Sequence, residues 1–182
     1  MKKIVLLLTT ALLVNFSVHA QSKSSVIKIN ILSPVVRTLS AFYEKPLSET
    51  SSFQLGLQYT GARLVGIRYS GFAITPEYRF YLSKTTDAPN GFYVAPFLRY
   101  QNLTVRDVDL TTSGTDAKLN TFGGGVLVGR QWLFGRSENV ALDLFIGPSY
   151  NAGSVNGDDI DVSSGFNGFG LRFGLALGLA LE

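Results

Sequence analysis

Large apolar residues alternate with small ones along residues 168–181, at the end of the chain. The apolar set is Phe169, Leu171, Phe173, Leu175, Leu177, Leu179 and Leu181. The other set is Gly168, Gly170, Arg172, Gly174, Ala176, Gly178 and Ala180. A period of two predicts a β-strand, because successive side chains point to opposite faces. An oily face opposite a small one suits a strand between lipid and a narrow barrel interior. A buried strand of a soluble sandwich is the alternative.

The same period recurs in seven earlier segments. They predict strands around residues 27–31, 39–44, 53–60, 72–82, 92–101, 121–132 and 140–150. Short turns are expected at 46–51, 83–91 and 135–139, and longer connections at 61–70, 104–118 and 152–165. Strands of roughly ten residues are long enough to cross a bilayer when tilted. The predicted fold class is therefore all-β: an eight-stranded antiparallel transmembrane β-barrel, with residues 168–181 closing against residues 27–32.

Aromatic residues of the apolar set gather at the strand ends. Those next to the short turns are Tyr43, Phe53, Phe80, Phe92 and Trp132. Those next to the longer connections are Tyr59, Phe72, Tyr100, Phe122, Tyr150 and Phe169. Two such belts, with mainly Leu, Ile and Val between them, are typical of a barrel that spans a membrane. A soluble lipocalin-like barrel buries its large residues inward and needs no belts.

The N-terminal segment predicts the compartment. Two lysines precede a mostly apolar run over residues 4–18, and Val18-His19-Ala20 places small residues at a cleavage position. This pattern predicts a cleavable signal peptide over residues 1–20, followed by an outer-membrane β-barrel domain over residues 21–182. An N-terminal anchor helix is the alternative, but polar residues at 9, 10 and 15 interrupt the run, which is short for a span.

Composition agrees with this interpretation. The 182 residues are only 16% charged and include 19 glycines, and their mean hydropathy is +0.20, yet no internal run is long enough for a spanning helix. Cleavage would remove Lys2 and Lys3 and lower the formal charge from +3 to +1. The pI of about 9.2 is therefore no argument for a nucleic-acid partner. The chain has no cysteine, which excludes disulfides and thiolate metal sites.

Seven charged residues fall on the inward set of positions. They are Lys28, Glu44, Glu77, Arg79, Arg99, Asp143 and Arg172. An eight-stranded barrel is just wide enough to be filled by side chains, and buried charges need partners. We expect these residues to form a structural ion-pair network. The alternative is a channel-lining polar path, with inward glycines leaving room for water.

Two features are irregular for a regular barrel. Arg130 falls on the apolar side, which predicts either snorkelling at the membrane boundary or a bulge that shifts the register. Pro76, Pro96 and Pro148 lie within strands, where proline removes a ladder donor. We expect bulges or local water at the prolines.

The residues that catalysis and metal binding need are scarce. The only histidine, His19, would leave with the signal peptide, so Ser–His chemistry is absent from the mature chain. Glu77 with Asp143 is one candidate acid/base pair, although a structural role is the favoured interpretation. Gly123-Gly124-Gly125 lacks the Lys-Ser/Thr of a phosphate loop, and Asp158, Asp159 and Asp161 lack the calcium-hand spacing. We predict no enzyme activity, catalytic residue, cofactor or metal.

Several motifs occur together in the chain. They are Lys28-Ile29-Asn30 before Leu32-Ser33-Pro34, Ile74-Thr75-Pro76-Glu77-Tyr78-Arg79, Ala95-Pro96-Phe97-Leu98-Arg99-Tyr100-Gln101, Asn120-Thr121-Phe122-Gly123-Gly124-Gly125 and Leu142-Asp143-Leu144-Phe145-Ile146-Gly147-Pro148. The chain resembles a family of small, uncharacterised outer-membrane β-barrel proteins of Gram-negative bacteria, with an OmpA/OmpX-like barrel and no C-terminal wall-binding domain. The resemblance implies the barrel fold and location in the cell outer membrane, and it carries over no catalytic residue. Many such barrels end on an aromatic residue, whereas this chain ends Leu181-Glu182.

The sequence thus favours a structural or surface-binding role for a small outer-membrane barrel that displays loops outside the cell. A narrow porin-like channel is the alternative, and a membrane-embedded lipid-modifying enzyme is a third, less favoured one. The expected partners are outer-membrane lipid and the barrel insertion machinery. We expect a monomer, and the sequence names no external ligand.

Overall fold

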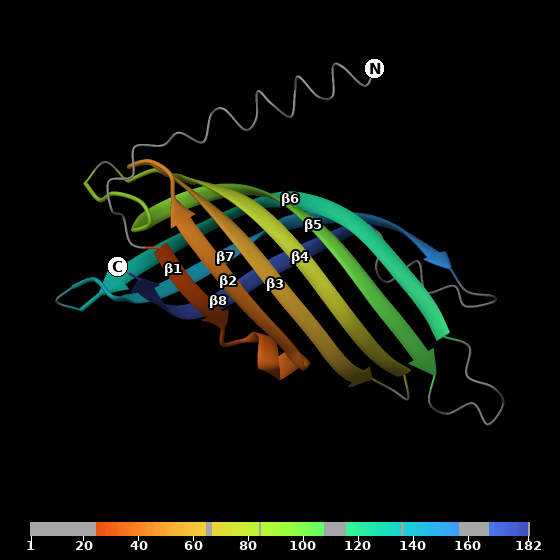
Figure 1. Cartoon of the computed structure of the whole chain (residues 1–182). Helices are drawn as coiled ribbons and strands as arrows, with labels where there is room; N and C mark the ends of the chain where they lie inside the picture. Colours follow the sequence, from red (N-terminus) through yellow and green to blue (C-terminus); the bar gives the residue numbers. More distant parts are fainter. Residues whose placement is uncertain are drawn as a thin grey trace, which may run out of the picture.

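The fold is a closed antiparallel barrel of eight strands. A computed structural model describes residues 25–64, 67–83, 85–107, 116–135, 137–156 and 168–181. The strands are β1 (Ser25–Asn30), β2 (Thr38–Pro46), β3 (Ser51–Leu64), β4 (Ile67–Tyr81), β5 (Gly91–Asp107), β6 (Asp116–Phe134), β7 (Val140–Asn156) and β8 (Gly168–Leu181). Consecutive strands pair, and β8 pairs with β1 (Figure 1). The predicted all-β, eight-stranded architecture is confirmed. The predicted signal peptide, 1–20, lies outside the described residues.

The only helical element among the described residues is η1 (Ser33–Val36), a 3₁₀ turn that contains Pro34. It joins β1 to β2. No helix in the described part of the chain is both long and apolar enough to cross a membrane.

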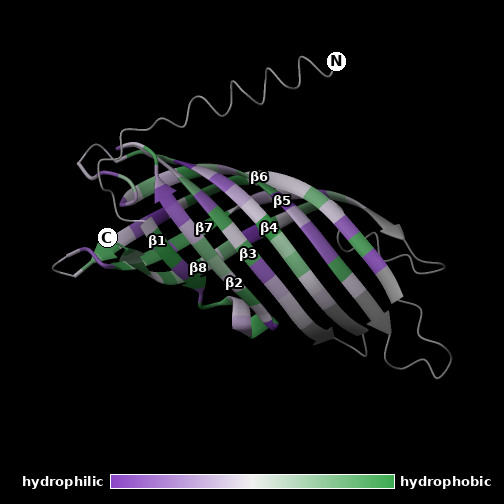
Figure 2. Cartoon of the chain, viewed as in Figure 1, coloured by the Kyte–Doolittle hydropathy of each residue, from purple (hydrophilic) through white to green (hydrophobic). Residues whose placement is uncertain are grey.

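The period of two in the sequence corresponds to two faces in the barrel wall. On β1, Val26 and Lys28 are completely buried inside, whereas the alternating Ile27 and Ile29 are about half exposed outside, at 47% and 51%. Hydrophobic and hydrophilic positions alternate in the same way along the strands in Figure 2. The barrel is thus inverted relative to a soluble protein, with charges inside and large apolar side chains outside.

The closing strand pairs as its sequence pattern predicts. Residues Ser25 to Asn30 of β1 face Leu181 to Ala176 of β8, and the Ile31 amide also donates to the Leu175 carbonyl at 2.9 Å. Each of the eight strands therefore has two hydrogen-bonded neighbours, and none of them is left as an edge.

The register around the barrel fixes its tilt and width. A path perpendicular to the strands leaves β8 at Ala180, crosses Val26, Glu44, Gln54, Glu77, Phe97, Gly125 and Ser149, and returns to β8 at Gly170. The path returns ten residues from its starting point. For eight strands, this shear gives a tilt of about 40° to the barrel axis. The lumen of such a barrel is narrow enough for side chains to fill.

The strands beyond β2 are longer than the roughly ten residues predicted. The six strands β3 to β8 have 14 to 19 residues. The predicted connection at 61–70 is wrong, because its residues pair as a β3–β4 hairpin in which Gly61 faces Ser70 and Leu64 faces Ile67. The extra length lies beyond the aromatic belts, where Asn102 and Asn120 pair across β5 and β6. A backbone ladder continues there because its hydrogen bonds do not require apolar side chains.

The predicted bulges at the prolines are absent from the described strand pairs. The β4–β5 register is the same on both sides of Pro76 and Pro96, and the β6–β7 register is the same on both sides of Pro148. Each proline instead lies at a short gap in the pairing with one neighbouring strand and keeps a register partner on the other. Pro76, for example, pairs with Leu55 on β3 and lies at a gap in the pairing with β5. The strands pass the missing donor without inserting a residue.

Arg130 also lies in an unshifted register. It faces Phe92 on β5 and Leu144 on β7, on the outer face. Its guanidinium lies 4.5 Å from the ring centroid of Phe92 and 5.0 Å from that of Trp132. Of the two predicted explanations, a bulge is therefore wrong. The arginine stacks on two outward aromatic rings at the short-turn end.

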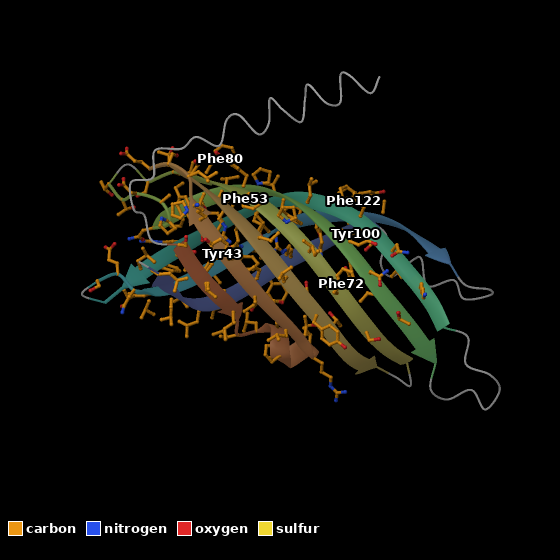
Figure 3. The ribbon with its side chains drawn as sticks, in the orientation of Figure 1. Tyr43, Phe53, Phe72, Phe80, Tyr100 and Phe122 are labelled. Atoms are coloured by element: carbon orange, nitrogen blue, oxygen red, sulfur yellow. The ribbon has the colours of Figure 1, made fainter. Side chains whose placement is uncertain are left out.

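The outward aromatic residues form two groups along the barrel. Figure 3 shows Tyr43, Phe53 and Phe80 toward the short-turn end and Phe72, Tyr100 and Phe122 nearer the other end. Each of these six rings is at least 40% exposed. Neighbouring rings contact one another within the second group, where the centroids of Phe72 and Tyr100 are 6.4 Å apart.

Inward glycines make room for aromatic rings from neighbouring strands. A Cβ atom at Gly129 would lie 2.5 Å from the ring of Tyr93, and one at Gly174 would lie 2.4 Å from the ring of Phe145. Gly56 and Gly125 stand in the same relation to Phe42 and Phe97, at 3.0 Å. The space that these glycines leave is therefore occupied by rings, where the channel alternative requires water.

Candidate functional site in the barrel lumen

All seven predicted inward charges face the lumen, and six of them form one connected group. We call this group the lumen cluster; it consists of Lys28, Glu44, Glu77, Arg79, Asp143 and Arg172. The first five are buried, with at most 1% of each residue exposed. Arg99, the seventh residue, makes no ion pair with any described residue.

Two cations and two carboxylates form the centre of the lumen cluster. Lys28 Nζ donates to Glu44 Oε2 at 2.5 Å and to Asp143 Oδ2 at 2.8 Å. Arg79 Nη1 donates to the same two oxygens, at 3.3 Å and 2.8 Å. Gln131 Oε1 accepts from both Lys28 and Arg79. These residues come from β1, β2, β4, β6 and β7, so the centre connects the wall from several sides.

Glu77 extends the cluster along the barrel axis. Its Oε2 accepts from Arg79 Nη2 at 3.2 Å and from Gln54 Nε2 at 3.0 Å. Its Oε1 accepts from Arg172 Nη2 at 2.5 Å. The Arg172 guanidinium also lies 4.7 Å from the Phe97 ring centroid, so Arg172 is held by one carboxylate and one aromatic face.

Uncharged side chains complete the network, and the sequence analysis did not single them out. Ser52 and Tyr81 donate to Glu44 Oε1 at 2.5 and 2.6 Å. Tyr93 donates to Asp143 Oδ1 at 2.7 Å, and Arg79 lies over its ring at 4.3 Å. Gln54 and Gln131 belong to the same class. Their inward alternation was the available signal, but only charge was used to select candidates.

The β4–β5 connection closes the lumen at the short-turn end. Ala88 is 3% exposed and packs with Tyr81, Tyr93 and other residues of the barrel core. The next carbonyl, that of Pro89, accepts a hydrogen bond from Gln131 Nε2 at 2.8 Å. This segment therefore lies across the short-turn end of the barrel, next to the lumen cluster. The sequence predicts only a polar turn there.

The geometry gives no support to the candidate acid/base pair. Glu77 and Asp143 each bond to Arg79, which lies between them, and no hydrogen bond joins the two carboxylates. Each also has at least one further donor. Each carboxylate accepts from three side chains of the network, which is the arrangement of a structural ion pair.

The described residues contain no candidate metal site. No group of three or more His, Cys, Asp or Glu side chains is placed there to hold an ion. Asp158, Asp159 and Asp161 lie outside the described residues.

The arrangement defines a class: a closed eight-stranded barrel with a paired, charged interior and an apolar exterior. The sequence profile of a family described as "Protein of unknown function (DUF3575)" matches residues 5–161. Because the match covers well over half of the chain, the protein belongs to this family. No curated protein and no solved structure matches the chain.

Removing one member of the lumen cluster should strongly destabilise the barrel. We expect Arg79→Met to lower the free energy of unfolding by about 3–5 kcal/mol, because Glu44, Glu77 and Asp143 each lose a cation while they stay buried. The measurement is urea unfolding of the purified protein, followed by the fluorescence of Trp132, the chain's single tryptophan.

Lys45→Met is the matched control for Arg79→Met. Lys45 follows Glu44 on β2 and is exposed on the outer face, so its replacement should change stability by less than about 0.5 kcal/mol. Equal effects of the two substitutions would contradict a stabilising role for the cluster.

Proposed function

We propose that this protein is an outer-membrane β-barrel of the OmpA/OmpX-like kind with a structural or surface-binding role, and that it displays its longer connections outside the cell. One observation carries the proposal: the distribution of polarity between the two faces of the wall. Charged and amide side chains are buried inside, while Leu39, Leu98, Val128, Leu144 and Leu171 are half exposed or more outside. Water would penalise such an exterior, whereas lipid favours it.

The height of the apolar band supports a membrane location. On β5, the outward residues run from Phe92 through Val94, Pro96 and Leu98 to Tyr100, which spans about 20 Å along the axis at a tilt of about 40°. A transmembrane barrel carries an apolar band of about 25 Å with aromatic girdles at both edges. Beyond Tyr100 the outer surface becomes polar, at Asn102 and Asn120.

The topology supports one orientation. Both described termini, Ser25 and Leu181, lie at the end with the 47–50, 82–90 and 135–139 turns. In outer-membrane barrels the short turns face the periplasm. The other end then faces outward, with η1 and the tall β5–β7 side of the wall (Figure 1). A rigid barrel with one tall rim is suited to holding surface segments in place.

A channel is the weaker alternative. The described lumen is filled by the lumen cluster, by Phe42, Phe97 and Phe145, and by the β4–β5 connection below them. An ion that crossed would have to displace charged groups from their partners, at a large energetic cost.

We expect the protein to be silent in a planar lipid bilayer. A filled lumen gives no water path, so the current at moderate voltage should equal that of a bilayer treated with detergent alone. Reproducible stepwise openings that appear only with the protein would favour the channel function instead.

An arginine on the outer face should be costly near the middle of the membrane. Leu175→Arg, midway along β8, should destabilise the barrel in lipid vesicles by about 2–4 kcal/mol. Phe169→Arg is the matched control at the belt level, where the cost should fall to about 0–1 kcal/mol. Unfolding in vesicles measures both, and equal costs would contradict a lipid-facing β8.

The cysteine-free chain allows a direct test of orientation. Val35 in η1 and Ser137 in the β6–β7 turn are both exposed, at opposite ends of the barrel. In intact cells, a membrane-impermeant maleimide should label Val35→Cys and should label Ser137→Cys only after the outer membrane is permeabilised. The reverse pattern would contradict the proposed orientation, and labelling of neither residue in intact cells would contradict surface display.

A further inference from the structure

Two arginines at the end of the lumen near the longer connections have guanidinium N–H groups without hydrogen-bond partners. Arg99 Nη2 donates to the neutral Gln58 Oε1 at 2.6 Å, which is the only hydrogen bond of Arg99 among the described residues. Among the side chains that the structure describes, Arg172 pairs with one carboxylate, that of Glu77. Within the described part of the chain, four buried side-chain atoms have no hydrogen-bond partner: Arg79 Nε, Gln54 Oε1, Arg99 Nε and Arg172 Nη1. Buried polar atoms are rarely left unpaired, and Arg99 and Arg172 bring two such donors to the same end of the lumen.

The charges inside the barrel point to the sign of the missing group. The described inward side chains include four cations, Lys28, Arg79, Arg99 and Arg172, and three carboxylates, Glu44, Glu77 and Asp143. Every one of the three carboxylates already accepts from at least three side chains. Among the described residues Arg99 therefore has no carboxylate partner, and the positive charge of Arg172 acts on it unfavourably. A partly buried cation without a counter-charge is unfavourable, and a negative group would relieve it.

The surroundings of the two arginines are open on one side and closed on the other. Arg172 faces inward, yet 12% of its side chain is exposed, so that exposure is toward the lumen. Gln58, Gln101, Ser149 and Asn151 line the same end with half-buried polar groups. Below Arg172 lie the rings of Phe97 and Phe145, at 4.7 and 5.3 Å from its guanidinium.

Glycines flank the two arginines on the wall. Gly123 is the register partner of Arg99 on β6, and Gly147 is that of Arg172 on β7. The Asn151 amide lies over Gly123, so a polar side chain from β7 borders the wall beside Arg99.

We propose that Arg99 and Arg172 form a binding site for a small soluble oxyanion of the phosphate or carboxylate type, which enters from the end of the longer connections. Guanidinium groups match phosphate and carboxylate oxygens with paired, charge-assisted hydrogen bonds. The ligand supplies the missing negative charge and accepts from the unpaired donors. The inference uses only the barrel interior and does not depend on the membrane location.

The test is a calorimetric titration of the purified full-length protein with inorganic phosphate, and then with acetate, at constant ionic strength. Lipid-free detergent excludes lipid phosphate as the source of the anion. We expect one-to-one binding of at least one of the two anions. Arg99→Gln should weaken it on the order of tenfold or more, because a charged hydrogen-bond donor is lost. Arg130→Gln, the same substitution on the outer face, should leave binding unchanged.

A second variant covers a folding failure of Arg99→Gln. Gln58→Glu places a carboxylate of nearly the same shape against Arg99 Nη2. We expect this variant to lose anion binding and to melt at a higher temperature than the parent in anion-free buffer. Together, these two changes distinguish an anion-binding site from a purely structural contact.

Three results would overturn the proposal. One is the absence of binding of both anions by the parent protein. Another is equal weakening by Arg99→Gln and Arg130→Gln. The third is a Gln58→Glu variant that is no more stable than the parent, since a carboxylate from elsewhere in the chain would then already neutralise Arg99.

Discussion

The barrel depends on one constraint: its lumen is too narrow to fill with water, so the polar side chains inside it need partners within the protein. Eight strands with a shear of ten residues leave an interior of side-chain width. The cations Lys28 and Arg79 occupy that interior with Glu44 and Asp143, and each oxygen that they contact serves more than one donor. Because the partners come from strands far apart in sequence, the cluster forms only when the sheet closes in the correct register. A slip by one residue on any of these strands would turn its charge toward the apolar exterior.

Glycine and aromatic residues satisfy the same constraint where charge is absent. Phe145 and Tyr93 each extend over an inward glycine on the next strand, Gly174 and Gly129. Each such pair of a large and a small residue fills space between the lumen cluster and the barrel wall. It also explains why the inner face of β8 looks almost empty in sequence. Side chains from neighbouring strands fill the space beside the inner face of β8, which itself contributes mainly Arg172.

The fold was largely predictable from the sequence, because a period of two that is sustained over eight segments admits few other structures. The inward charges were predictable for the same reason, since Lys28, Glu44, Glu77, Arg79, Arg99, Asp143 and Arg172 all keep the parity of their strands. Strand lengths were not, because the hairpin end at 61–70 pairs its backbone although Arg63 and Arg68 interrupt the series of large apolar residues on the outward positions. The closure by Pro89 was equally hidden, since a carbonyl that bonds to Gln131 across the chain leaves no local pattern. Which charges would pair was also inaccessible, because pairing depends on the depth of each side chain in a sheared barrel.

The depth of the charges makes the lumen asymmetric, and Glu77 is the residue that joins its two halves. Below Glu77, carboxylates balance Lys28 and Arg79 completely; above it, Arg172 shares Glu77 and Arg99 has only an amide. A purely structural network would gain nothing from an excess cation at its open end, since a glutamate at Gln58 would complete it at no cost in volume. At the closed end, Glu44 and Asp143 match the charges of Lys28 and Arg79, although Arg79 Nε has no partner among the described residues. The lumen is therefore closed and neutral at the short-turn end and carries an excess positive charge at the other end. Because Arg172 and Arg79 bond to different oxygens of the same Glu77 carboxylate, this one side chain connects the two ends of the lumen.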